Sequence, residues 1–498
     1  MRRQAAAVRA ELERLPRAIW VLALVAVINA LCWAALTPAY WVPDEPAHAG
    51  YAQRIAETGA LPDLDATAPK IGLVAGSQEQ RTVYDALPFG VEGQPSWSET
   101  KDRTLDSQLT DGPPLNRTRP RQALNATGNP PLYYLLQAIP YRAAYGAGYL
   151  DRLMAMRAFS TLFAGLTVFF GFLFLRQLLP GRPWAWTVGS AALAFQPMLG
   201  FMSGGVNNDG LLYALGAALL WGVARAFRRG LTPSTGALIG VVLALGLLTK
   251  STMIGLVPGL TVAVVALVLR DRDRRSALKG ALTLAFVSGA PFAAWLVLRA
   301  RITGESAAPA GGVVSASAAG GLEGLRGMVS YLWQAALPRL PFMEDQFPYF
   351  APWFVYFQGF IGRFGWFQFG FSTLWYWIAL GVFAALAVLA ARALLAHRAA
   401  LRARWPEAAT YLALLAGLFL SVEVAAFGYK DSTGIFFEQA RYLFPVLALY
   451  GAFVALAVIG CGRRWEKAAG VTVAILAVGH SLFSQLLTID RFYLGAPY

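Results

Sequence analysis

The feature that most constrains how this chain can fold is its succession of long apolar runs. Several runs of roughly 18–25 residues are long enough, as helices, to cross a hydrocarbon layer about 30 Å thick. Of the 498 residues, 57% are hydrophobic and only 14% are charged. These values exclude a disordered chain and exceed the apolar content of an ordinary soluble enzyme. The sequence therefore predicts an all-α protein that crosses a membrane many times.

Eleven segments have the length and composition of spanning helices. They are residues 18–37, 153–177, 184–204, 210–227, 234–249, 253–270, 279–299, 371–395, 407–427, 441–460 and 468–488. A twelfth segment, "NPPLYYLLQAIPYRAAYGAG" at 129–148, has an ambiguous length and contains Arg142 and interior prolines. If it does not span, all the basic segments between the spans fall on one face, as the positive-inside rule requires. We therefore predict about eleven spans, the N-terminus inside, the C-terminus outside, and 129–148 lying in the interface.

The charge distribution narrows the functional classes. The formal net charge of +14 comes from short basic clusters between apolar runs, which is typical of cytoplasmic loops and gives no support for nucleic-acid binding. The two cysteines, Cys32 and Cys461, lie in or beside apolar runs, so they indicate neither a disulfide framework nor a thiolate metal site. The frequent Arg, Ala and Gly suggest a bacterium, so we expect a multi-pass protein of the bacterial cytoplasmic (inner) membrane.

This topology makes residues 1–498 a single membrane domain with two large extracytoplasmic segments. The first, 38–152, is rich in Pro, Gly, Asp, Arg and Gln, and would hold the interface helices. The second, 301–370, begins with Gly, Ala and Ser and then becomes strongly aromatic. Because no Walker pattern occurs in the chain, ATP-driven transport has no support.

An acidic pair follows the first span directly, in "PAYWVPDEPAHAGYAQ" at 38–53. Asp44 and Glu45 stand between two prolines at a position that suits the start of a helix, where a carboxylate caps the free N–H groups and interacts favourably with the helix dipole. A carboxylate held at the membrane surface can equally serve as a general base that deprotonates a hydroxyl. The local sequence leaves both interpretations open.

Other polar side chains come to the same predicted outer face, where ionisable groups are costly and tend to mark function. They are His48, Asn208, Asp209, Lys250, Arg363, Arg441 and Tyr442. Lysine and arginine at the interface can hold a lipid-linked phosphate and stabilise its charge as it leaves. Aromatic side chains can accommodate a prenyl chain and stack on a sugar. These parts suit a membrane-embedded group transferase.

The order of these motifs carries a resemblance to known proteins. "PDEPAH", "NPPLYYLL", "RLMAMRAFSTLFAGLTVFF", "VNNDGLL", "LLTKSTM", "IGRFGWF" and "QARYLFPVL" follow one another through roughly residues 18–460. In this order they resemble the GT-C superfamily of integral membrane glycosyltransferases, which includes protein O-mannosyltransferases and lipid A aminoarabinose transferases. The closest resemblance is to a largely uncharacterised bacterial family of GT-C-like membrane proteins.

The resemblance implies roles for particular positions. It makes Asp44 the candidate catalytic base with Glu45 second, and it makes Lys250 and Arg441 the groups facing the lipid phosphate; we add Arg363 to them. His48, Asn208, Asp209 and Tyr442 would support these groups. The implied reaction moves a sugar from a polyprenyl-phosphate donor to a hydroxyl of a glycan, lipid or protein. The implied enzyme is thus a polyprenyl-phosphate-sugar-dependent, inverting glycosyltransferase.

Three alternatives remain open at this level. A transporter or flippase of a lipid-linked saccharide would move the lipid without covalent chemistry. The others are a non-catalytic relative and an O-antigen-type polymerase or ligase; a polymerase would use lipid diphosphate donors and more arginines around a large outside loop. As to cofactors, oligosaccharyltransferases of the superfamily need a divalent ion, whereas the O-mannosyl and aminoarabinose types do not. One acidic pair with Asp209 is a thin ligand set for such an ion, so we expect no metal and no other cofactor.

Overall fold

The computed structural model of the chain describes residues 15–61, 80, 82–83, 99–110, 126–303, 321–436 and 438–494. The remaining parts of the two large segments, and the basic residues before position 15, lie outside the described residues. The helices are α2 (Arg17–Leu36), α3 (Glu45–Thr58), α5 (Glu99–Thr110), α6 (Leu132–Ala143), α7 (Tyr149–Leu178), α8 (Pro183–Ala194), α9 (Pro197–Ser203), α10 (Asp209–Arg229), α11 (Pro233–Leu247), α12 (Val257–Arg270), α13 (Arg274–Thr303), α15 (Gly321–Ala336), α16 (Pro352–Gly362), α17 (Thr373–Ala396), α18 (Arg398–Ala403), α19 (Trp405–Thr433), α20 (Ala448–Gly460) and α21 (Glu466–Tyr493). Two 3₁₀ helices, η1 (Ser251–Leu256) and η2 (Ala440–Val446), precede α12 and α20, and β1 (Arg363–Phe364) pairs antiparallel with β2 (Phe369–Gly370).

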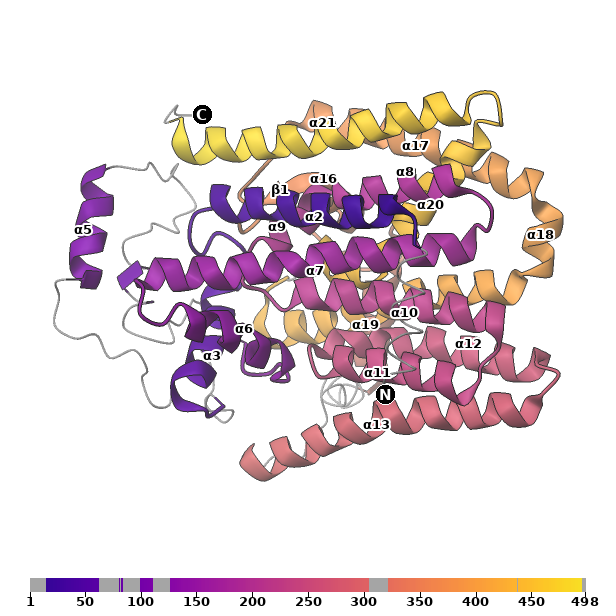
Figure 1. Cartoon of the computed structure of the whole chain (residues 1–498), viewed down its shortest axis with the longest axis horizontal. Helices are drawn as coiled ribbons and strands as arrows, with labels where there is room; N and C mark the ends of the chain where they lie inside the picture. The colour runs from indigo at the N-terminus through magenta and orange to yellow at the C-terminus, as the bar shows by residue number, and fades with distance from the viewer. Residues whose placement is uncertain are drawn as a thin grey trace.

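Long helices lie side by side in a bundle, with α7 packed between α2 and α10 (Figure 1). A large cluster of buried Leu, Val, Ala and Phe joins α7, α10, α11, α12 and α19. By contrast, α17 and α13 keep most of their apolar side chains exposed on the outside of the bundle. An apolar exterior of this kind suits lipid, because lipid tails do not penalise exposed Leu and Val.

Eight of the described helices are long and apolar enough to span a membrane, and the count rises to nine if the bent pair η2 and α20 forms one span. The prediction of eleven spans differs at three places. Residues 184–204 form two helices, α8 and α9, with a break before Pro197, and residues 234–249 give α11 with only 15 residues. Residues 441–460 bend by 72° between η2 and α20. Proline at each break explains the first and the last, because it removes a backbone donor and clashes with the preceding turn.

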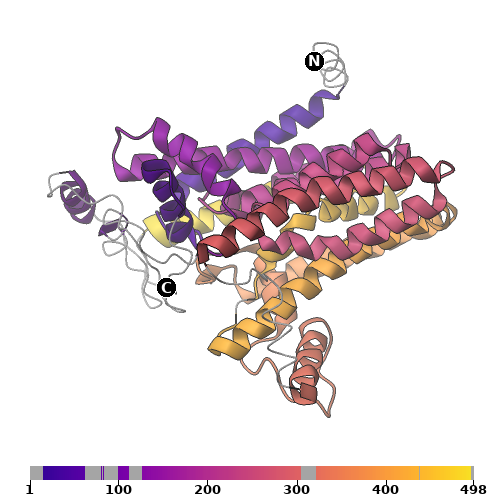
Figure 2. The same cartoon turned by 90° about the horizontal axis from the view of Figure 1, so that it is seen from below.

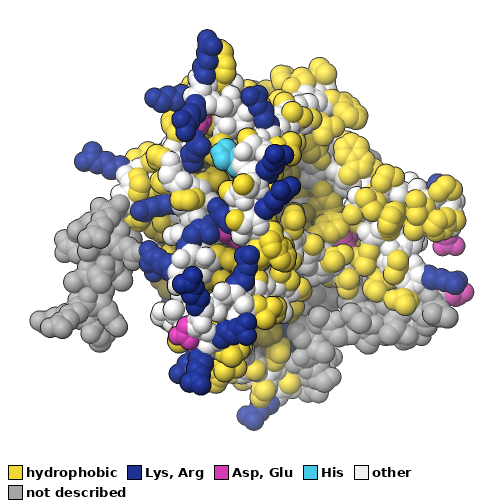
Figure 3. All heavy atoms as spheres, turned by 90° about the vertical axis from the view of Figure 1, so that its right-hand side faces the viewer, with side chains coloured by type: hydrophobic (Ala, Val, Ile, Leu, Met, Phe, Trp, Pro, Cys, Tyr) yellow, Lys and Arg dark blue, Asp and Glu magenta, His cyan; other side chains and the backbone are white. Residues whose placement is uncertain are grey.

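The segment 129–148 does not form a long helix. Its helical part, α6, has 12 residues, which is about 18 Å and too short to cross a hydrocarbon core. It packs on α3 and on the start of α7, at one end of the bundle (Figure 1). At the opposite end, where α18 lies, Lys and Arg side chains gather over the surface (Figure 3). This separation supports the predicted orientation, with the α18 end inside.

The second large segment folds against the bundle in two pieces. Helix α15 packs on the end of α19, and Figure 2 shows it outside the main bundle, beside the projecting end of α19. Its Tyr331 is buried among aromatic rings that include Phe347. Helix α16 and the β1–β2 hairpin instead pack against η2 and α9. This contact brings Arg363 to the end of the bundle that holds α3.

Candidate functional site

The chain turns sharply as it leaves α2. Thr37 is extended, as expected for a residue before proline, and it ends the helix. Tyr40 and Asp44 then adopt positive φ angles of 69° and 63°. A left-handed conformation costs roughly 1–2 kcal/mol for most residues, and aspartate is among those that tolerate it best. Two such positions within five residues indicate that contacts elsewhere hold this turn in place.

Glu45 makes the contacts that hold the turn after α2 in place. The Arg157 guanidinium donates to both of its carboxylate oxygens, with Nε–Oε1 at 2.7 Å and Nη2–Oε2 at 2.5 Å. The backbone N–H groups of Tyr40 and Val206 donate at 2.8 and 2.9 Å. The Glu45 side chain is fully buried, so all of its donors come from the protein. The pair joins the turn after α2 to α7, and it leaves Glu45 no access to a substrate.

Asp44 begins α3 with a different geometry. It stands at the N-cap position, but its side chain caps no backbone N–H group. Instead, Asp44 Oδ2 accepts a hydrogen bond of 2.6 Å from Arg441 Nη2 of η2, and 34% of its side chain remains exposed. Burial acts to raise the pKa of the Asp44 carboxyl, but the Arg441 guanidinium outweighs it and leaves the pKa below its ordinary value. Asp44 is therefore an accessible, ionised carboxylate.

A second ion pair lies beside the first. Lys250 Nζ, in the break between α11 and η1, is 2.5 Å from Asp209 Oδ1 at the start of α10. Asp209 Oδ2 is 3.7 Å from Arg441 Nε, so Arg441 joins the two pairs. The Tyr442 ring lies under both cations, 5.2 Å from Lys250 Nζ and 5.0 Å from the Arg441 guanidinium carbon. Asp44, Asp209, Lys250, Arg441 and Tyr442 form what we call the charged cluster.

A close helix contact positions this cluster. A Cβ atom on Gly216 of α10 would collide with the backbone carbonyl of Pro445 in η2. The absence of a side chain at Gly216 thus lets η2 approach α10 closely, which brings Arg441 to Asp209. Before α10, the Asn207 amide donates to the Pro43 carbonyl at 2.8 Å. The segments that carry Asp44 and Asp209 are thereby fixed to each other.

Several polar atoms in the charged cluster and of the adjacent Asn208 have no hydrogen-bond partner among the described residues. They are Arg441 Nε, Arg441 Nη1, Asp209 Oδ2 and Asn208 Oδ1. Arg441 is nearly fully buried, and buried guanidinium N–H groups ordinarily find acceptors. A phosphate oxygen is a strong acceptor that matches the geometry of two such N–H groups.

Arg363 reaches the neighbouring space. A narrow pocket beside the cluster is lined by Arg363 and Arg441, with Pro43 and Gln439 among the other residues. The Arg363 guanidinium donates to the Gln358 side chain at 2.9 Å and to a backbone carbonyl of the hairpin at 3.0 Å. These neutral partners orient the guanidinium and leave its charge without an ion pair among the described residues.

His48 and Asn208 meet on a tyrosine that the sequence did not single out. His48 Nδ1 lies 2.8 Å from the hydroxyl of Tyr134, and the two rings stack. The Asn208 amide approaches the same hydroxyl at 3.5 Å and the Thr249 carbonyl at 3.4 Å. Burial, acting against the nearby Asp44 carboxylate, lowers the pKa of His48 to about 4, so its imidazole is neutral at physiological pH. His48 and Asn208 thus connect α3, α6 and the start of α10 behind the charged cluster.

The structure therefore brings most of the predicted site residues to one end of the bundle. It adds Arg157 and Tyr134. The sequence contained a signal for Arg157, because an arginine within an otherwise apolar span is costly and needs a partner. As to metals, the described residues contain no group of three or more His, Cys, Asp or Glu side chains arranged to hold an ion. The expectation of no metal stays a prediction.

Comparison with solved structures defines the class. The Archaeoglobus fulgidus oligosaccharyltransferase in the apo form is similar over 96% of this chain and 56% of its own, with a TM-score of 0.52 and 14% identity. AglB from the same archaeon, in complex with an inhibitory peptide and a dolichol-phosphate, gives a TM-score of 0.49 at 14% identity over 96% and 56%. ArnT from Cupriavidus metallidurans in the apo state also gives 0.49, at 15% identity over 95% and 77%. The chain spans little more than half of the oligosaccharyltransferase. The likeness to its apo form shows a fold: this is a multi-pass membrane protein of the GT-C fold.

Within that class, the family is defined by sequence. The chain belongs to the family described as predicted membrane protein (DUF2142), whose model matches residues 8–450. No curated protein matches the chain. The match covers the first nine predicted spans and the first half of the tenth, together with the charged cluster and both large segments. The narrower resemblance to proteins with the "PDEPAH" and "NPPLYY" motifs stays a prediction.

Proposed function

We propose that the chain is an inverting glycosyltransferase that moves a sugar from a polyprenyl-phosphate donor to an acceptor hydroxyl at the outer face of the bacterial cytoplasmic membrane. The observation that carries this proposal is the Asp44–Arg441 contact: an accessible carboxylate bonded to a nearly buried arginine that has further N–H groups to offer. A base and a phosphate-binding cation thereby stand side by side. The GT-C fold is consistent with the proposal.

Each group has a step in the reaction. The exposed Asp44 carboxylate accepts the proton of the acceptor hydroxyl, whose oxygen forms a bond to the anomeric carbon. The bond from that carbon to the phosphate oxygen breaks, and the electron pair leaves with the polyprenyl phosphate. Arg441, Lys250 and Arg363 stabilise the charge that develops on the departing phosphate. A single displacement of this kind inverts the anomeric centre.

The same contact offers a way to switch the base on. Without donor, Arg441 holds the pKa of Asp44 down and makes the carboxylate a weak base. A donor phosphate that binds Arg441 competes for its positive charge, and the pKa of Asp44 then rises toward its ordinary value. Asp44 would thus become a stronger base only when a donor is bound, so that it deprotonates the acceptor when transfer can follow.

The test is a donor screen with purified protein and a panel of radiolabelled polyprenyl-phosphate sugars, reading release of lipid phosphate. Asp44→Asn keeps the shape of the side chain and removes its basicity, so we expect transfer to fall by about 10²–10⁴-fold with donor binding retained. Asp151→Asn, an exposed carboxylate at the start of α7, is the matched control and should remain active. Full activity of Asp44→Asn would end the base assignment. If no donor is consumed while reconstituted vesicles move a labelled lipid, the transporter or flippase alternative gains.

A further inference from the structure

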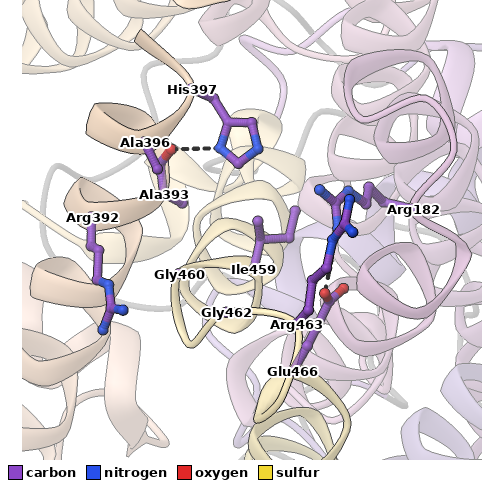
Figure 4. A pocket seen from close by; sticks show the side chains of 10 residues that line it. All are labelled: Arg182, Arg392, Ala393, Ala396, His397, Ile459, Gly460, Gly462, Arg463 and Glu466. Atoms are coloured by element: carbon purple, nitrogen blue, oxygen red, sulfur yellow. Dashed lines mark hydrogen bonds and ion pairs between the residues drawn. The ribbon is translucent and has the colours of Figure 1, made fainter.

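A second pocket lies at the basic end of the bundle, away from the charged cluster. Its volume is about 240 Å³, slightly below the usual range for drug-sized ligands. It is formed where α8 and α21 begin and α17 and α20 end, and it is lined by Arg182, Arg392, His397, Arg463 and Glu466 (Figure 4). Such a volume suits a small polar head group rather than a nucleotide or a folded partner.

The pocket has an excess of positive charge. Arg182 lies 3.4 Å from Glu466, so this arginine is paired. Arg392 and Arg463 make neither a hydrogen bond nor an ion pair with any residue that the structure describes. In Figure 4 the side chains of Arg182, Arg463 and Glu466 converge on one side of the pocket, and that of Arg392 lies across it. Two guanidinium groups are thereby left to bind an anion, and guanidinium matches phosphate with paired N–H donors.

Part of the pocket lining is apolar. Ala393, Ala396 and Ile459 line the pocket together with the arginines. At Gly460 a Cβ atom would collide with the Leu389 carbonyl, so α20 and α17 are in close contact there. The outer surface of α17 next to the pocket is apolar and exposed, with Leu395 71% exposed. A ligand with a phosphate and an attached hydrocarbon chain would find both of its parts matched.

We propose that this pocket binds the phosphate group of an anionic phospholipid of the inner leaflet. The positive-inside rule places the α18 end at the cytoplasmic surface, where anionic head groups lie within reach of the arginines. The acyl chains would follow the exposed surface of α17. The bound lipid would brace the ends of α17, α20 and α21, and this role is independent of the proposed transfer reaction.

The experiment measures lipid retention. The full chain is reconstituted in nanodiscs of equal parts phosphatidylglycerol and phosphatidylcholine, released into mild detergent, and examined by native mass spectrometry. The test variant combines Arg392→Ala with Arg463→Ala. The control combines Arg398→Ala with Arg402→Ala, two exposed arginines of α18 that remove the same charge from the same surface outside the pocket. All four side chains are exposed, so the fold should tolerate every change.

We expect wild type and the α18 control to retain phosphatidylglycerol in preference to phosphatidylcholine. The pocket variant should lose about tenfold or more of this retention, because each basic residue near the surface adds to anion binding. Equal loss in both variants would show general surface attraction and overturn the proposal, as would the absence of preferential retention in wild type. A second arm adds inorganic phosphate to protein in phosphatidylcholine alone and follows thermal unfolding. Stabilisation there that requires Arg392 and Arg463, without lipid retention in the first arm, would reject the lipid in favour of a free phosphate.

Discussion

Glu45→Gln is the substitution for which the structure gives the sharpest stability prediction. Each carboxylate oxygen of Glu45 accepts from one Arg157 nitrogen and one backbone N–H group. A glutamine keeps the size but turns one oxygen into an NH₂ group, so in either orientation two donors face a donor. The Arg157 guanidinium would keep one hydrogen bond to the glutamine oxygen and its bonds to the backbone carbonyls of Ala34, Thr37 and Pro38, but its charge would have no anionic partner.

Two routes give the magnitude. Loss of two charge-assisted hydrogen bonds at about 1.5–3 kcal/mol each amounts to about 3–6 kcal/mol. Removal of one partner from a buried ion pair costs about 3–5 kcal/mol. We therefore expect Glu45→Gln to lower the free energy of unfolding by about 3–5 kcal/mol. Because Asp44 is partly exposed and the asparagine oxygen can still accept a hydrogen bond from the Arg441 guanidinium, Asp44→Asn should cost only about 1 kcal/mol.

The assay is reversible unfolding in mixed micelles titrated with sodium dodecyl sulfate, followed by tryptophan fluorescence. Glu45→Gln, Arg157→Met and the double variant complete a thermodynamic cycle. We expect the double variant to be more stable than the sum of the single losses by about 1–3 kcal/mol, since the second change removes a group that the first left unpaired. A Glu45→Gln protein within 1 kcal/mol of wild type, or less affected than Asp44→Asn, would refute this account of the buried pair.

The remaining predictions concern the neighbours of this pair. The pKa of His48 is about 4 in the folded chain and about 6.5 when unfolded, so the unfolded state binds the extra proton as the pH falls from 6.5 to 4. Unfolding free energy should decline over this window by on the order of 3 kcal/mol, and His48→Gln should flatten the decline; an unchanged pH profile would contradict the assignment. Lys250→Met should weaken binding of polyprenyl phosphate about tenfold, or about 1.4 kcal/mol, whereas Lys250→Arg should retain the binding. Equal binding by wild type and both variants would exclude Lys250 from the phosphate site. Gly216→Ala should lower the free energy of unfolding by about 1–3 kcal/mol and displace Arg441, with loss of transfer. Gly381→Ala, where a Cβ meets open space, should leave stability unchanged. Similar thermal unfolding of the two alanine variants would contradict the close contact between Gly216 and η2.

Sequence reasoning predicted the candidate site through topology. Asp44, Lys250 and Arg441 each lie next to the end of a span, and span parity put those ends on one face. The structure adds that ion pairs connect them: Arg441 pairs with Asp44, and both Arg441 and Lys250 contact Asp209. The parity argument could not give this distance, because it says on which side a residue lies and not which helices are neighbours.

The division of roles between Asp44 and Glu45 could not be read from the sequence. Adjacent residues at a helix start differ by about 100° in direction, so only one of the two carboxylates can face the open side. Which one does depends on the left-handed conformation of Asp44 and on an arginine that is 112 positions away in the chain. Arg157 itself was visible as an arginine near the start of an apolar span, but its partner depends on how α7 packs against the turn after α2.

The predicted spans that came out short or broken contribute Lys250, Arg441 and Tyr442 to the charged cluster. Lys250 stands in the gap between α11 and η1, Arg441 lies in η2 before the 72° bend, and α9 lines the pocket beside Arg441. At membrane depth, irregular backbone is tolerated only where protein or a polar cavity satisfies its free groups. A straight helix in place of η2 and α20 would follow the bundle axis without this bend and would point Arg441 elsewhere. The departure from eleven regular spans and the assembly of the site are thus two consequences of the same broken helices.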